Sequence, residues 1–224
     1  IPGGGEVPDS VHFHSIRFQL IFCARGWVDL VYEDQGPPFR LVAGDCVVQP
    51  PEIRHRVLHA SPALEVIEIG CPAVHDTFIE HELALPTEVV DRERSFGGQR
   101  FVHDRAAEAV WEPWLLEGLR SRRAGVAAAT ADLAGVRVVD AASAPTAGPR
   151  WLHHDGEFVF DVVLHGSAVL RIDDRSGVRT EPIGTRDAIA IPPGARWQWG
   201  EWSEDFEFLE VTLPADPVTV DPST

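Results

Sequence analysis

The sequence lacks several features that would place it in a familiar class of proteins. Its three cysteines are an odd number without a CxxC pair, which argues against a disulfide framework and favours buried thiols in a reducing compartment. No apolar run approaches the roughly 18 residues that a membrane span needs. The chain begins at Ile1 and contains no methionine, so we expect the translated start to lie upstream. From these absences we predict a cytoplasmic protein without a membrane segment.

Basic residues are scarce. The 224 residues include 19 Lys+Arg against 35 Asp+Glu, which gives a net charge of −16 and a pI near 4.9. A nucleic-acid-binding face needs clustered basic side chains that displace counterions from phosphates. We therefore exclude nucleic acid and anionic membrane surfaces as partners and expect a small-molecule substrate.

Short apolar runs fill the sequence instead. Each has the length of a strand, and turn-forming residues such as Pro192-Pro193-Gly194 separate them. The best helix-like segment, residues 105–123, is interrupted by Pro113 and Gly118. Many short strands at regular spacing predict an all-β sandwich or barrel. The clearest runs are Leu20–Cys23, Trp27–Tyr32, Asp45–Gln49, Leu64–Ile69, Phe158–Leu164, Ala168–Ile172, Ala188–Ile191 and Phe206–Leu213.

An internal repeat relates the two halves of the chain. Gly26 and Gly166 each follow an apolar run and precede a strand, an acidic turn and a second strand that ends at a Pro-Pro pair. We therefore place one domain at residues 1–95 and a second at residues 96–224. Strands that match residues 125–140 would fall largely before residue 1. We expect the first domain either to lack them or to take them from a segment outside this sequence.

Three histidines and a glutamine form a regular pattern in the first half. The chain reads His12-Phe13-His14, then Gln19, then Gly26, and a second motif ends at His55. Residues two apart on a strand point to the same face, so His12 and His14 can both point into a barrel. Gln19 and His55 would come from neighbouring strands and converge at the same depth.

The spacing resembles the two sequence motifs of the cupin superfamily. The first family motif is HxH, three or four residues, Glu, six residues and Gly; the second is Gly, five residues, PxG, two residues and His. Here Gln19 stands where the family has Glu, and Glu52 stands where it has Gly. The resemblance implies an all-β fold with two cupin barrels (double-stranded β-helix, or jelly roll) in one chain. It also implies a metal site in the first barrel on His12, His14, Gln19 and His55.

Such a ligand set suits one divalent transition metal: Zn, Fe, Ni or Mn. One or two coordination positions stay open for water or substrate, as in catalytic sites. A neutral Gln19 leaves the ion its full positive charge, which favours Lewis-acid catalysis by a lyase, isomerase or cyclase on a small organic substrate. Two alternatives stay open: a metal-dependent dioxygenase, and a non-catalytic sensor or binding protein.

The second half has lost most of these ligands. Counting back from Gly166 places Leu152, His154 and Val159 at the first three ligand positions, and Trp197 falls at the fourth. Of these four positions only His154 has a side chain that binds metals, so we expect this barrel to bind no metal. Its clustered tryptophans either form an aromatic pocket or fill the space that a metal and substrate would occupy.

The candidates for catalysis carry weaker signals. His59 shares strand parity with His55, which makes it a candidate proton shuttle. Glu68 is a candidate general base, and an ordinary polar position on a strand is the alternative for both residues. Cupins commonly pair through barrel edges, so we also expect a homodimer.

Overall fold

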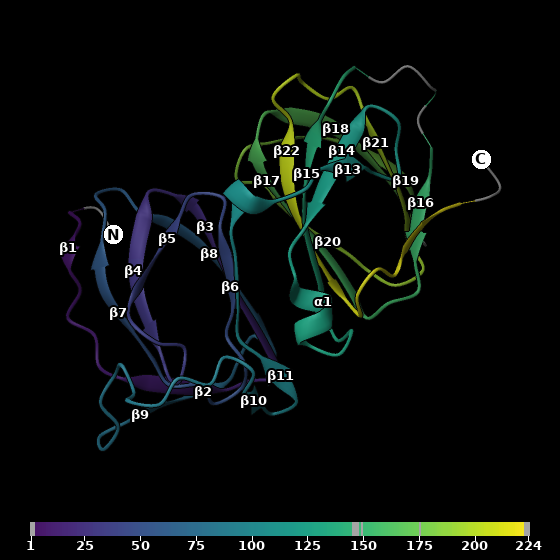
Figure 1. Cartoon of the computed structure of the whole chain (residues 1–224). Helices are drawn as coiled ribbons and strands as arrows, with labels where there is room; N and C mark the ends of the chain where they lie inside the picture. The colour runs from purple at the N-terminus through teal and green to yellow at the C-terminus, as the bar shows by residue number, and fades with distance from the viewer. Residues whose placement is uncertain (1–2, 145–147, 149, 175, 222–224) are drawn as a thin grey trace. The chain divides into compact units, whose positions relative to one another are not determined.

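A computed structural model describes residues 3–144, 148, 150–174 and 176–221. It divides the chain into two compact units (Figure 1). The N-terminal unit is Ile1–Glu108 with Ala129–Ala131, and the C-terminal unit is Ala109–Ala128 with Asp132–Thr224. Regular structure among the described residues is nearly all strand, which confirms the predicted all-β class.

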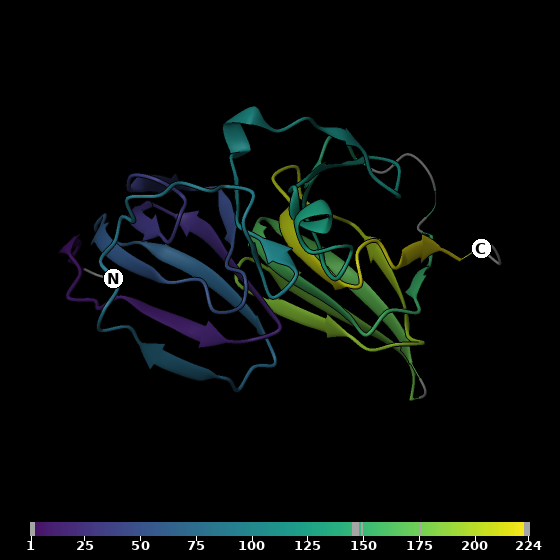
Figure 2. The same cartoon turned by 60° about the horizontal axis from the view of Figure 1, so that its bottom comes forward.

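The N-terminal unit consists of two sheets and a small hairpin (Figure 2). One sheet has the order β5-β4-β7-β2-β9, with β1 paired to β7, and the other has the order β12-β6-β3-β8. β10 pairs with β11. The strands are β1 Gly5–Glu6, β2 His12–Ser15, β3 Phe18–Arg25, β4 Trp27–Tyr32, β5 Phe39–Val42, β6 Cys46–Val48, β7 His55–Ala60, β8 Glu65–Cys71, β9 Asp76–Ile79, β10 Ser95–Phe96, β11 Gln99–Arg100 and β12 Val102–Asp104.

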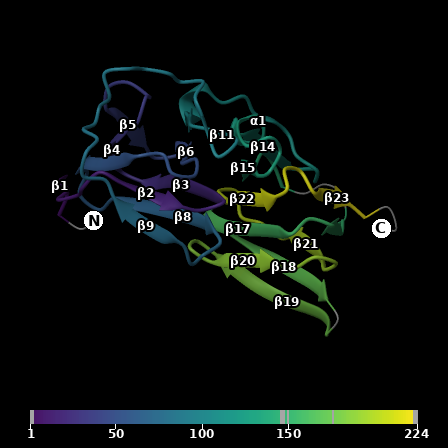
Figure 3. The ribbon, with the colours of Figure 1, turned by 90° about the horizontal axis from the view of Figure 1, so that it is seen from below.

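The C-terminal unit repeats this plan (Figure 3). Its sheets have the orders β19-β18-β21-β16-β23 and β13-β14-β15-β22-β17-β20. The strands are β13 Glu112–Pro113, β14 Leu119–Arg123, β15 Gly135–Ala141, β16 Leu152–His154, β17 Phe158–His165, β18 Ser167–Asp174, β19 Gly177–Gly184, β20 Ala188–Ile191, β21 Arg196–Gly200, β22 Glu207–Leu213 and β23 Val218–Val220.

One detail of the sequence-based prediction differs from the structure. The continuous part of the N-terminal unit runs to Glu108, not to residue 95, because β12 pairs with β6 of that unit. Residues 105–123 form no continuous helix. They contain a 3-10 turn at Ala106–Glu108 and the strand β14, which pairs with β15. The one α-helix of the described residues is α1, Val126–Ala129, and no helix there is long and apolar enough to cross a membrane.

The repeat extends to the register of the strands. β2–β9 match β16–β23 in order and pairing, so Ile21 lies opposite Glu68 as Asp161 lies opposite Glu210. The two units differ at one sheet edge. β15 covers the outer edge of β22, whereas β8 pairs only with β3 within the part of the chain that the structure describes.

The repeated glycines have a physical reason. Gly26 and Gly166 have φ angles of +77° and +70°, a conformation that side chains with a Cβ rarely adopt. A Cβ at either position would collide with a serine hydroxyl, that of Ser61 or Ser203. Each glycine therefore allows the chain to reverse tightly between two long strands of its unit.

Apolar side chains from both sheets fill each unit. In the N-terminal unit Val28, Leu30 and Tyr32 of one sheet pack with Cys23 and Val47 of the other. The C-terminal core is larger and includes two fully buried tryptophans. The predicted apolar runs thus coincide with strands that supply the two cores.

Candidate metal centre

Three histidines converge between two neighbouring strands of the N-terminal unit. His12 and His14 share one face of β2, and His55, the first residue of β7, lies directly opposite His12. The ring centroids lie 4.3 Å apart for His12 and His55, and 5.2 Å apart for both other pairs. One ring nitrogen of each histidine lies within 4.8 Å of the others, a group that could hold a metal ion.

The other ring nitrogen of each histidine is engaged elsewhere. The Nδ1 of His12 lies 2.8 Å from the Ser10 carbonyl oxygen, and that of His55 lies 3.1 Å from the Ile53 carbonyl oxygen. A carbonyl oxygen only accepts, so Nδ1 carries the proton in both rings and Nε2 keeps its lone pair. The Nδ1 of His14 lies 2.9 Å from the Thr77 hydroxyl oxygen. Such contacts orient imidazoles that ligate metals.

Burial keeps these imidazoles in the neutral form that binds metals. Burial, aided by the neighbouring His12, lowers the pKa of His55 to about 3. The pKa of His14 is also lowered, first by burial and then by His12 and His75. Metal ligation requires a neutral imidazole, so both rings are ready for it near neutral pH.

Gln19 lies in the wall of the same cavity and is almost completely buried. Its amide nitrogen donates to the Oε1 of Glu68 at 2.7 Å. Its carbonyl oxygen accepts from the Nε2 of Gln49 at 3.0 Å, and the Oε1 of Gln49 in turn accepts from the Tyr32 hydroxyl at 2.5 Å. An ionised carboxylate only accepts hydrogen bonds, so Glu68 fixes which way the side-chain amides of Gln19 and Gln49 are oriented.

Sequence reasoning missed Gln49 and Tyr32. The signal for Gln49 was present, because it lies two residues after the buried Val47 and therefore on the same face of the chain. Its Nε2 also lies 3.4 Å from the Nε2 of His55, which places Gln49 beside the candidate ligands. Tyr32 is the single tyrosine of the chain, and its ring stacks on His55 at 5.4 Å.

The two catalytic candidates have different positions. Glu68 lines the cavity, whereas His59 is exposed and lies opposite Asp29. We expected His59 to point to the same side as His55, but a β-bulge interrupts β7 between them. Val57 and His59 are two residues apart on β7, yet they pair with adjacent residues of β4, Leu30 and Asp29. The bulge turns His59 away from the cavity, so the expectation that it lines the site is wrong.

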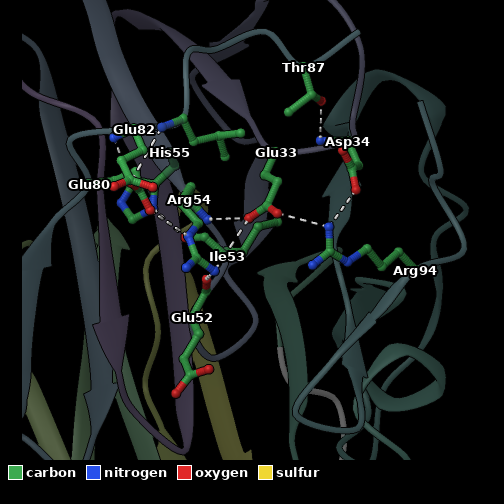
Figure 4. Close-up of polar contacts among 11 residues, drawn as sticks. Glu33, Asp34, Glu52, Ile53, Arg54, His55, Glu80, Glu82, Thr87 and Arg94 are labelled. Carbon is green, nitrogen blue, oxygen red and sulfur yellow. Dashed lines mark hydrogen bonds and ion pairs between the residues drawn. The ribbon is translucent and has the colours of Figure 1, made fainter. Parts of the chain in front are cut away.

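A network of ion pairs holds the loop that leads into His55 (Figure 4). The Glu33 carboxylate accepts from the Arg54 backbone nitrogen at 3.2 Å and from the Nη1 of Arg94 at 2.8 Å. The Arg54 side chain pairs with Glu80 at 3.3 Å. In this loop Glu52 has a φ of +64°, the conformation that the family glycine adopts without strain. These contacts fix the backbone from which His55 projects.

The C-terminal unit has different side chains at the matching positions. Leu152 lies opposite Trp197, as His12 lies opposite His55, and both replacements are fully buried. His154 is buried, and its Nε2 lies 3.0 Å from the Ile191 carbonyl oxygen. Within the described residues, His12, His14 and His55 are the one group of three or more His, Cys, Asp or Glu side chains that could hold a metal.

The tryptophans of the C-terminal unit divide between two environments. Trp197 and Trp199 are fully buried in its core, so their rings fill space. Trp114 and Trp202, together with an edge of Trp199, line a cavity of about 610 Å³, and the indole nitrogen of Trp202 donates to the Ser143 carbonyl oxygen at 3.1 Å.

Comparisons with known proteins identify the fold. No family model and no curated protein matches the sequence. Among solved structures, the formate complex of Lactobacillus farciminis oxalate decarboxylase matches with a TM-score of 0.71 and 14% identity, over 98% of this chain and 76% of that chain. The R92A mutant of Bacillus subtilis oxalate decarboxylase matches with a TM-score of 0.68 and 14% identity, over 96% and 67%. The structure of the Bacillus subtilis enzyme at pH 4.6 matches with a TM-score of 0.66 and 15% identity, over 96% and 66%. At these identities the likeness shows the cupin fold alone.

Proposed function

We propose that this chain is a bicupin whose N-terminal barrel binds one divalent transition metal on His12, His14, Gln19 and His55. The observation that supports the proposal best is the convergence of three imidazole nitrogens while the Nδ1 atoms of the same rings have other partners. Nitrogen donors with one neutral oxygen suit zinc, iron, nickel or manganese. When bound, the ion supplies Lewis-acid catalysis, in which a carbonyl oxygen is polarised or the pKa of a water is lowered.

Gln19 favours non-redox chemistry. Its amide adds no negative charge to the ligand set, whereas a glutamate at this position would stabilise a trivalent ion. Because the amide nitrogen of Gln19 donates to Glu68, the ligand atom of Gln19 is its carbonyl oxygen, which accepts one hydrogen bond from Gln49 and has a second lone pair for the ion. We therefore place the reaction among those of lyases, isomerases or cyclases that act on a small organic molecule.

Glu68 is the proposed general base. It lines the same cavity as the histidines, and its Oε1 already accepts from Gln19, so Oε2 can take a proton from a substrate. The hydrogen bond from Gln19 holds the carboxylate in place. His59 has no such role, because it lies outside the cavity.

The proposal is tested by loading the protein with iron(II) under nitrogen and then admitting air. We expect wild-type iron to stay ferrous, as shown by the absence of an iron(III) signal in electron paramagnetic resonance. The matched variant Gln19→Glu should oxidise faster, because a carboxylate stabilises the trivalent ion. Iron(III) that forms as fast in the wild type as in the variant would refute the argument from the neutral amide, and failure to bind either iron or zinc would refute the metal site.

A further inference from the structure

The cavity beside the three histidines is polar at the candidate ligands and apolar further along the same strands. Ile21 follows Gln19 on one face of β3, and Val57 follows His55 on one face of β7. We call these regions its polar half and its apolar half. Six of its lining side chains are polar: His12, His14, Gln19, Gln49, His55 and Glu68. Six are branched aliphatic side chains: Ile21, Val28, Leu30, Val57, Leu64 and Val66. A molecule whose head group meets the histidines therefore places the rest of its body against hydrocarbon. The cavity measures about 280 Å³, roughly the volume of nine water molecules in the liquid.

No cationic side chain lines this cavity among the described residues. The chain contains no lysine, and Arg54, the residue directly before the ligand His55, is engaged by other side chains. Arg54 pairs with Glu80 and Glu33, and its guanidinium covers the ring of Phe13. Glu68 is the one carboxylate in the lining, and it contributes a negative charge at the polar half.

These observations set the charge that a ligand can bring. A divalent ion on neutral ligands and one glutamate leave a single positive charge in the polar half. A monoanion neutralises that charge. A second anionic group leaves a net negative charge in the cavity even when it also ligates the ion, because no cationic side chain among the lining residues compensates for that charge.

We propose that the substrate of this site is a small, branched or otherwise apolar organic molecule with one oxygen-containing head group and at most one negative charge. This inference rests on the proposed metal site and adds a substrate class to it. The class excludes compact dianions, among them the oxalate that the titles of the similar solved structures name.

Isovalerate and malonate form a matched pair of probes for this class. Both are carboxylates with the same number of heavy atoms, and the isopropyl group of one replaces a carboxylate of the other. Their affinities for the zinc-loaded protein are measured by isothermal titration calorimetry, after the zinc content has been determined. We expect isovalerate to bind at least about tenfold more tightly than malonate. The methyl groups of isovalerate pack against the apolar half, whereas the second charge of malonate has no cationic partner in the cavity.

Two variants test the reason for the preference. Val66 lies on the rim of the cavity with 45% of its surface exposed, so Val66→Arg adds a cation there without disturbing the core. Glu68→Gln removes the negative charge. Each variant should narrow the difference between the two probes at least about threefold, mainly through tighter binding of malonate.

The outcomes separate the two proposals. A protein that takes up no zinc refutes the metal site itself. A zinc-loaded protein that binds malonate as tightly as isovalerate, or binds neither, refutes the substrate class and leaves the metal site standing. A preference for isovalerate that Val66→Arg does not change shows that charge is not the cause, which also overturns the inference.

Discussion

Asp161 in the C-terminal unit gives a quantitative prediction about stability and pH. It shares a face of β17 with the core residues Val159 and Val163, and both of its carboxylate oxygens are buried without a hydrogen-bond partner. Glu210 lies directly opposite and is itself paired with Arg137 at 3.0 Å. Burial, reinforced by the charge of Glu210, raises the pKa of Asp161 well above its ordinary value of 3.8.

The sign and size of the effect follow from that shift. The folded unit keeps a proton on Asp161 that the unfolded chain releases above its pKa of 3.8, so the free energy of unfolding falls as the pH rises above that value. The loss is about 1.4 kcal/mol for each pH unit between the unfolded-state pKa and the folded-state pKa. Asp161→Asn cannot ionise. Relative to the wild type, it should therefore gain up to about that much stability as the pH rises over this interval.

Urea unfolding followed by tryptophan fluorescence measures this difference. All tryptophans except Trp27 belong to the C-terminal unit, so the signal reports mainly on that unit. Asp155→Asn, at an exposed position of the same unit, is the control and should track the wild type at each pH. If the stability difference between Asp161→Asn and the wild type is the same at pH 4 and pH 6, Asp161 is not held protonated and the reasoning is refuted.

Three further predictions concern other parts of the molecule. Glu52→Gly should stabilise the N-terminal unit by about 1 kcal/mol and raise its Tm by a few degrees, because glycine adopts the φ of +64° without strain. The control Glu52→Ala should not raise the Tm. A lower Tm for Glu52→Gly would contradict this explanation. Thr77→Val removes the partner of His14 Nδ1 and should weaken zinc binding at least about tenfold in a competition titration. Thr219→Val removes a threonine contact to His153 in the C-terminal unit and should leave zinc binding unchanged. Burial raises the pKa of the Cys23 thiol to about 11, so Cys23 should react slowly with a thiol reagent. Mass spectrometry after a brief treatment should find the half-buried Cys71 labelled first. Earlier labelling of Cys23 would show that the core around Cys23 unfolds locally and would contradict the prediction.

Most of the strands were predictable from the sequence, because short apolar runs bounded by turn residues leave few other structures. The repeat was also predictable, since Gly26 and Gly166 anchor equivalent turns in both units. The same counting placed Leu152 and Trp197 at equivalent positions, and the structure pairs them across two strands.

The remaining features depend on contacts that no local pattern records. A bulge of one residue in β7 reverses the parity on which the expectation for His59 depended. The chain of hydrogen bonds from Tyr32 to Glu68 joins four different strands or strand ends, so sequence spacing carries no trace of it. The domain boundary shifted because β12, far along the chain, returns to pair with β6.

The most direct test of the central claim is the metal content of protein purified without chelators or nickel affinity, measured by plasma emission spectroscopy. We predict one equivalent of a transition metal in the wild type, little or none in His12→Ala and His55→Ala, and the wild-type amount in His154→Ala, whose histidine lies in the C-terminal unit and outside the group of three histidines. Circular dichroism should show that all three variants keep the strand content of the wild type. Metal content that is unchanged in both His12→Ala and His55→Ala would contradict the assignment of the site.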